Sequence, residues 1–181
     1  MRAVPVLSIC LLLSMPVLGS SAGAQSLTEK TGINSLIGRA PSTQDFVTEA
    51  GISDMFEIQS SKLALDKVSD DAIKTFARHM VTDHGKTTAK LEDMVDSGKV
   101  KAKPPTVLDS SHQSLLDKLK SLSGADFKKE YLDDQVKGHK DAVDLFKRYS
   151  KGGTNPDLKQ FAETVLPTIE RHLDMAQTLD K

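Results

Sequence analysis

The chain has 181 residues, with 24 basic and 25 acidic side chains and a net charge of −1 at neutral pH. Both signs of charge are interleaved along the sequence, which argues against nucleic acid as a partner. The length indicates one domain, and the absence of Trp removes the usual stacking platforms for bases and sugars.

The first segment in chain order has the pattern of a secretory signal peptide. Arg2 supplies a positive start, residues 6–18 form a short apolar run, and Ala22-Gly23-Ala24 offers small residues at a cleavage point. We therefore predict that residues 1–24 are removed and that the mature chain begins at Gln25. This pattern predicts a periplasmic or secreted protein without a membrane span after processing.

The single cysteine, Cys10, lies inside this signal sequence. A processed chain then has no thiol for disulfides or thiolate chemistry. A nucleophile-elbow motif and a glycine-rich phosphate loop are also missing from the sequence. These absences disfavour an enzyme of the hydrolase or nucleotide-dependent type, and we expect no catalysis.

Residues 25–41 show no clear periodicity, and we interpret them as a mobile leader. From Ser42 to the end, residues 42–181, capping residues and glycines indicate helices throughout. Ser42-Thr43-Gln44-Asp45 is a capping box, and Asn155-Pro156 is an N-cap followed by proline. The predicted helices cover about residues 42–67, 69–97, 110–122, 126–150 and 155–181.

The lengths of the connections predict the topology. Short turns join the first long helix to the second and the third to the fourth, so each pair should be an antiparallel hairpin. The segment from Gly98 to Gly124 is long enough to cross the bundle and carries the short helix. We therefore predict an all-α, ferritin-like four-helix bundle with a long crossover between helices 2 and 3.

One ionisable residue interrupts the apolar face of each long helix near its middle. These residues are Glu57, His84, His139 and His172. Interior positions rarely hold such side chains unless they are paired, hydrogen-bonded or bound to metal. Because the four positions are at similar heights, we predict that they converge in one layer of the bundle.

Particular residues also give the chain a family resemblance, which extends over about residues 42–179. The string Phe76-Ala77-Arg78-His79-Met80-Val81-Thr82-Asp83-His84 resembles the bacterial family catalogued as domain of unknown function 4142. So do Phe46-Val47 with Ala50 and Glu57, the mid-helix His139, and Leu166-Pro167 followed by His172. The resemblance implies a ferritin-like fold in secreted or periplasmic proteins and carries no established activity.

A di-iron site of the ferritin type is disfavoured by the sequence. Such a site needs a Glu-x-x-His pair on two helices, and the residues three before His84 and His172 are Val81 and Ile169. A single zinc or copper ion held by the three histidines and Glu57 is chemically reasonable. Met80 and Met175 would add soft ligands for Cu(I).

The alternative to a metal site is a purely structural role for these buried polar residues. Buried histidines can be neutral and hydrogen-bonded, with Glu57 or Asp83 as partners, and methionines at helical spacing usually fill a core. His79 and His112 fall off the inward stripes, and Asp133 and Asp134 are expected at the surface. We therefore expect an exported, non-catalytic envelope or stress-related protein, and the alternative is a metal-binding or redox protein; neither identifies a protein partner.

Overall fold

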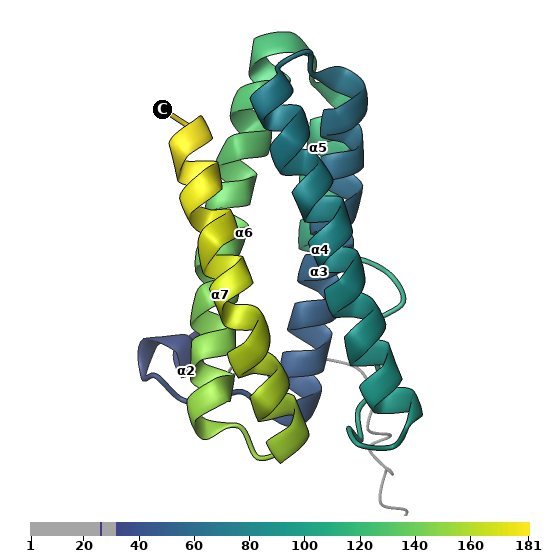
Figure 1. The fold of residues 1–181 in the computed structure, drawn as a ribbon, viewed down its shortest axis with the longest axis vertical. Helices are drawn as coiled ribbons and strands as arrows, with labels where there is room; N and C mark the ends of the chain where they lie inside the picture. The colour runs from purple at the N-terminus through teal and green to yellow at the C-terminus, as the bar shows by residue number, and fades with distance from the viewer. Residues whose placement is uncertain (1–25, 27–31) are drawn as a thin grey trace, which may run out of the picture.

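The computed structural model describes Ser26 and residues 32–181. The predicted signal peptide and the expected new terminus at Gln25 lie outside these residues. Within the described part, every regular element is a helix, which confirms the predicted all-α class (Figure 1). The elements are α2 (Ile33–Leu36), α3 (Thr43–Lys67), α4 (Asp71–Asp96), α5 (Ser110–Ser121), α6 (Gly124–Gly152) and α7 (Pro156–Leu179).

Side-chain caps start most of the helices where the sequence predicted them. Ser42 accepts a hydrogen bond from the backbone N–H of Asp45, and Asn155 accepts one from Leu158. These caps satisfy amide groups that have no partner inside the helix. The third long helix differs slightly, because it begins at Gly124, two residues before the predicted start.

The four long helices form a bundle in which the chain runs up, down, down and up (Figure 1). Residues 68–70 join α3 to α4, and residues 153–155 join α6 to α7, so each pair is an antiparallel hairpin. Contacts between α3 and α6 and between α4 and α7 unite the two hairpins. This order is the predicted ferritin-like connectivity.

The crossover returns the chain from the lower end of α4 to the upper end of α6. Its helix, α5, packs on both α3 and α6 and so covers that side of the bundle. The strap, which we define as residues 97–109 between α4 and α5, is held to α3 by Gln44, whose side chain forms hydrogen bonds with the backbone N–H and C=O of Lys103. A Cβ on Gly51 would lie 2.8 Å from the ring of Pro105, so this close approach of strap and helix requires glycine.

Residues 32–41 lie against α6, whereas the backbone N–H of Ser26 donates a hydrogen bond to Asp45 of α3. Ser35 donates a hydrogen bond to Asp144, and Arg148 donates one to the backbone carbonyl of Arg39. Leu36 and Ile37 point to solvent, with exposed fractions of 87% and 67%. Whether residues 25–41 form a mobile leader stays a prediction.

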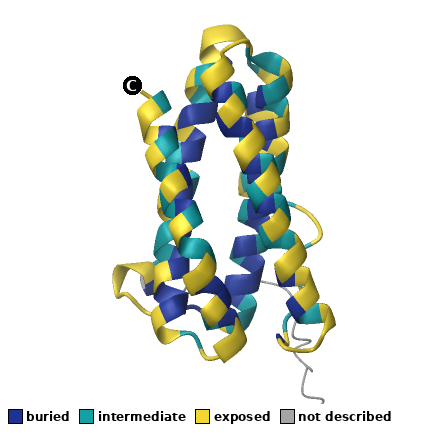
Figure 2. Ribbon diagram, viewed as in Figure 1, coloured by how far each residue is buried: buried dark blue, intermediate teal, exposed yellow. Residues whose placement is uncertain are grey.

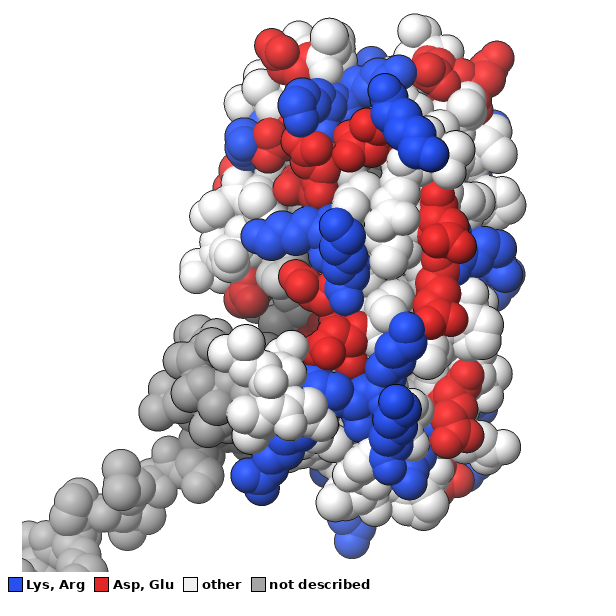
Figure 3. Space-filling view, turned by 90° about the vertical axis from the view of Figure 1, so that its left-hand side faces the viewer, with Lys and Arg blue, Asp and Glu red and all other residues white. Residues whose placement is uncertain are grey.

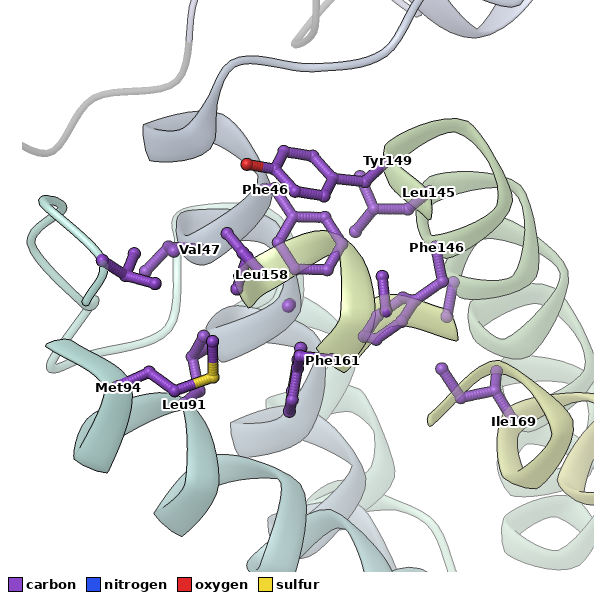
Figure 4. Packing of buried hydrophobic residues seen from close by; sticks show 14 residues of the cluster. Phe46, Val47, Leu91, Met94, Leu145, Phe146, Tyr149, Leu158, Phe161 and Ile169 are labelled. Carbon is purple, nitrogen blue, oxygen red and sulfur yellow. The ribbon is translucent and has the colours of Figure 1, made fainter. Parts of the chain in front are cut away.

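Two apolar clusters fill the ends of the bundle. The lower cluster contains Phe46, Val47, Ala50, Leu91, Met94, Val100, Ala142, Leu145, Phe146, Tyr149, Leu158, Phe161, Ala162 and Ile169 (Figure 4). The upper cluster contains Phe56, Ala64, Ile73, Phe76, Ala77, Met80, Leu116, Leu119, Phe127, Tyr131, Leu132 and Ala176. Buried residues run along the inner side of every long helix (Figure 2).

The surface is charged and mixed in sign. On the side shown in Figure 3, Lys and Arg alternate with Asp and Glu rather than forming a basic patch. Within the range that the structure covers, none of the helices combines the length and apolar character needed to cross a membrane. These features agree with the near-neutral charge of the sequence.

Candidate metal centre

A polar layer separates the two apolar clusters. We define it as Asp54 and Glu57 of α3, His84 of α4, Gln135 and His139 of α6, and His172 of α7. Each of these side chains is buried, with exposed fractions between 0% and 5%. Four separate helices therefore each contribute to one interior site, and helical phase predicted the inward direction of all four candidate residues.

The three imidazole rings form a nearly equilateral triangle. Their centroids are 5.6 Å apart for His84 and His139, 5.5 Å for His84 and His172, and 5.6 Å for His139 and His172. The histidines are therefore not dispersed through the bundle. The predicted convergence holds for these three residues.

One nitrogen of each ring is engaged by a neighbour. His84 Nδ1 lies 2.7 Å from a carboxylate oxygen of Asp54, and His139 Nδ1 lies 2.8 Å from the backbone carbonyl of Gln135. His172 Nε2 lies 3.2 Å from a carboxylate oxygen of Asp83. Because these partners are acceptors, the network assigns an N–H to the engaged nitrogen of each ring.

In its neutral form, each ring keeps a lone pair on its other nitrogen. His84 Nε2, His139 Nε2 and His172 Nδ1 are buried and have no hydrogen-bond partner among the described residues. One potential ligand nitrogen from each ring lies within 4.8 Å of those of the other two. A buried acceptor without a partner is unfavourable, so three of them in one interior layer require an explanation.

The separations between the ring centroids are those expected around one shared metal ion, whereas the separations between the nitrogens are larger than expected. With bonds of about 2.0–2.1 Å, three rings arranged radially around a metal would have centroids roughly 5.2–5.5 Å apart and nitrogens roughly 3.3–3.6 Å apart. The observed centroids are already at 5.5–5.6 Å, whereas the nitrogens are separated by up to 4.8 Å. The ring spacing therefore already fits a shared ion, whereas the nitrogens are farther apart than such an ion requires.

Glu57 lies beside this triangle and is not one of the three converging groups. Its Oε1 is 3.7 Å from His139 Nδ1, the nitrogen already directed at Gln135. A Cβ on Gly138 would be 3.1 Å from the same oxygen, so glycine leaves room for the carboxyl group. Burial raises the pKa of Glu57 to about 7, against the opposing positive charge of His84. A ligand role for Glu57 stays a prediction.

The three histidines differ in their electrostatics. Burial, aided by the positive charge of His84, lowers the pKa of His139 to about 3 and that of His172 to about 4. Burial also disfavours the charged form of His84, but the hydrogen bond and negative charge of Asp54 outweigh it and raise the pKa of His84. Two rings are therefore neutral at physiological pH, whereas Asp54 shifts the pKa of the third ring toward its charged form.

Asp54 was not among the residues predicted from the sequence. It binds His84 through one oxygen and accepts a hydrogen bond from Thr88 at 3.1 Å through the other. Its position could have revealed it, because Asp54 comes four residues after Ala50 and three before Glu57, on the same inward stripe. Asp54 is thus the carboxylate that sequence reasoning overlooked.

Other sequence expectations have mixed outcomes. Asp133 is exposed as expected, whereas Asp134 is buried, and burial with the charge of Glu130 raises the pKa of Asp134 to about 6. The expectation of a surface position for Asp134 was therefore wrong, because α5 covers that face of α6. His79 is exposed as predicted, and Met80 packs in the upper apolar cluster.

The fold and this interior define an all-helical bundle with a buried polar layer at mid-height. The chain matches the family described as "Domain of unknown function (DUF4142)" over residues 31–179, and it belongs to that family. The resemblance seen in the sequence is thereby confirmed. No curated protein matches the chain.

Solved structures share the fold at low sequence identity. A structure titled "CopM in the Cu(II)-bound form" superposes with a TM-score of 0.65 at 14% identity, covering 78% of this chain and 97% of that one. A DUF305 protein from Streptomyces coelicolor gives a TM-score of 0.64 at 16% identity, covering 76% and 90%. A DUF305 fragment from Deinococcus radiodurans gives 0.65 at 14%, covering 78% and 97%. At these identities the likeness concerns the fold alone.

Proposed function

We propose that this protein binds a single divalent transition-metal ion, copper or zinc, through His84, His139 and His172. One observation supports the proposal above the others. Three buried imidazole nitrogens, one from each ring of a triangle, have no hydrogen-bond partner among the described residues, while the second nitrogen of each ring is engaged. A cation is the group that three converging lone pairs would stabilise.

The surroundings of the rings favour the same conclusion. Histidine ligands of metals typically donate their second N–H to a carboxylate or a backbone carbonyl, which fixes the tautomer and the ring orientation. Here Asp54 and Asp83 take the carboxylate role and Gln135 the carbonyl role. The two carboxylates would also balance the charge of a divalent ion in the bundle interior.

Copper is the first ion to test, and zinc is the second. Three imidazoles suit both ions, and Cu²⁺ binds nitrogen ligands more strongly than the other divalent ions of its row. CopM, a protein of the same fold, has been solved with Cu(II) bound. A bound ion would leave one coordination position for Glu57 or water.

Metal titration of untagged protein tests the proposal. Cu²⁺ or Zn²⁺ should bind at one equivalent and raise the melting temperature, because the ion binds the native state selectively. His84→Ala or His139→Ala should abolish that rise, whereas His79→Ala, which removes an exposed histidine from α4, should leave it intact. Equal shifts in all variants would exclude these histidines as ligands and favour a purely structural hydrogen-bonding role.

We also propose that the protein acts in the cell envelope or outside the cell. The support is the signal-peptide pattern, with Arg2, the apolar run at residues 6–18 and the small residues before Gln25. Mass spectrometry of the exported protein should find Gln25 at the amino terminus. An intact Met1 in the envelope fraction would contradict export by this route.

A further inference from the structure

The side of the bundle between α4 and α7 carries two hollows, one above and one below the histidines. The lower hollow has a volume of about 420 Å³ and includes Lys86 and Thr164 in its lining. The upper hollow has a volume of about 590 Å³ and includes His79 and Arg171. Apart from Lys99, every lining residue of both hollows belongs to α4 or α7.

The other sides of the bundle are closed by chain connectivity and packing. The α3–α4 and α6–α7 sides are antiparallel hairpins, and α5 packs across α3 and α6. The α4–α7 side has no such cover in the described part of the chain. It is also the side where two of the three imidazoles, those of His84 and His172, originate.

Asp83 occupies the bridge between the two hollows. One carboxylate oxygen lies 3.2 Å from Nζ of Lys86, which lines the lower hollow. The other lies 4.0 Å from Nη2 of Arg171, which lines the upper hollow, and 3.2 Å from Nε2 of His172. The Asp83 side chain is 22% exposed, whereas that of His172 is 1% exposed. Asp83 thus connects solvent with a buried ring of the site.

We propose that metal ions reach and leave the three histidines between α4 and α7, with Asp83 as the carboxylate that first captures the ion. This inference rests on the proposed metal function. A partly exposed carboxylate attracts a hydrated divalent cation, and Asp83 is already in contact with one of the ligand rings. Lys86 and Arg171 compete with the incoming cation for that carboxylate, so they slow its capture.

Proline in α7 supports an opening on this side. Pro167 lies inside the helix, five residues before His172, and cannot donate a backbone hydrogen bond to the carbonyl four residues earlier. The helix is therefore less constrained near the bridge than a continuous helix would be. Small displacements of α7 at this level would join the two hollows.

Stopped-flow loading of Cu²⁺ into untagged protein, followed by tyrosine fluorescence, tests this route. Asp83→Asn should slow the association rate roughly tenfold, because the capturing charge is lost at the mouth. Lys86→Ala should raise that rate several-fold. Two variants serve as matched controls. Asp54→Asn removes the buried carboxylate that pairs with His84. Lys90→Ala removes another lysine of the lower hollow, one that pairs with Asp93.

The outcomes distinguish the proposed entry route between α4 and α7 from the proposed metal binding itself. The route is supported if Asp83→Asn slows association of Cu²⁺ while Asp54→Asn leaves the association rate unchanged and speeds only dissociation. It also requires that Lys86→Ala raises the association rate more than Lys90→Ala does. It is overturned if Asp83→Asn loads at the wild-type rate, or if both asparagine variants slow association equally. If wild-type protein binds no Cu²⁺ at equilibrium, the proposed function fails, and the route fails with it. Circular dichroism of each variant verifies that the bundle is folded.

Discussion

The lower apolar cluster and the polar layer are neighbours along the axis of the bundle, and they differ in how their buried groups are paired. In the cluster, the Phe46 ring contacts those of Phe146 and Tyr149 with centroids 4.9 Å and 4.3 Å away, and apolar surface is buried against apolar surface. In the layer, five buried polar atoms have no partner in the part of the chain that the structure describes: Glu57 Oε2, His84 Nε2, Gln135 Oε1, His139 Nε2 and His172 Nδ1. We expect the cluster to stabilise the fold and the layer to lower its stability in the absence of a ligand.

This difference indicates how the site is kept open. Without the clusters above and below, water could enter between the three imidazoles, and the rings could turn away from one another. The packed ends hold the helices at a fixed spacing, so the middle can tolerate unfavourable groups.

The largest expected effect comes from the lower cluster. Phe46→Ala should reduce the free energy of unfolding by about 3–5 kcal/mol, because a fully buried ring leaves a cavity. Chemical denaturation measures this loss, and the remaining folded protein should bind metal as the wild type does. Val107→Ala, at a residue that is 72% exposed, is the control and should change stability by less than about 0.5 kcal/mol. A parallel loss of metal affinity in Phe46→Ala would show that the two regions are not separable.

The second effect concerns the layer alone. Asp54→Asn should weaken metal binding by about 10–100-fold, because His84 loses the carboxylate that orients its ring. Isothermal titration measures the affinity. Asp66→Asn removes an exposed carboxylate from the same helix and should have no effect. Wild-type affinity in Asp54→Asn would contradict the role assigned to this hydrogen bond.

The third effect is a pH dependence of stability in metal-free protein. Because the pKa of His139 falls from its ordinary 6.5 to about 3 on folding, the unfolded chain binds a proton at this residue that the folded chain rejects. The associated stability is complete above pH 6.5 and is lost as the pH falls toward 3. Relative to His139→Leu, the wild type should lose about 2 kcal/mol between pH 7 and pH 5.

Comparison with the variant is necessary because other groups oppose this trend. The raised pKa of Glu57 makes the folded protein take up a proton between about pH 4.5 and 7, which adds stability as the pH falls. That contribution is common to both proteins and cancels in the difference. Parallel pH profiles of wild type and variant would refute a neutral, desolvated His139.

The smallest effect is a gain. At pH 7, His139→Leu in chelator-treated protein should be about 1 kcal/mol more stable than the wild type, because a buried lone pair without a partner is removed at similar volume. Thermal melting measures the gain, and added metal should then give no further rise. His79→Leu, at an exposed position, should leave the metal-free stability within about 0.5 kcal/mol. A destabilised His139→Leu would mean that the polar layer supports the fold.

Local signals made most of the fold predictable. Ser42, Asp70 and Asn155 cap helices through contacts with nearby residues, so their role is encoded within a few positions. Short turns and one long connection then leave few ways to arrange four helices. Asp134 escaped this reasoning, since its burial depends on α5, a short helix whose docking side is set by tertiary packing.

The site was predictable in direction but not in detail. Helical phase indicates that Glu57 and the three histidines point inward, but it does not give their rotation about the side-chain bonds. Glu57 consequently lies at the engaged side of His139, and Asp54 takes a place beside His84 that the sequence pattern left unassigned. For His84 and His172, ring orientation depends on hydrogen bonds between helices, which no single helix encodes.

The hairpin topology has a kinetic consequence. His84 belongs to the α3–α4 hairpin, whereas His139 and His172 belong to the α6–α7 hairpin. Each hairpin can form from contacts close in sequence, but the three rings meet only after the hairpins dock across the crossover. A metal that needs all three histidines would therefore bind after docking and slow the separation of the two halves, so the ion would lengthen the lifetime of the native state with little effect on the folding rate.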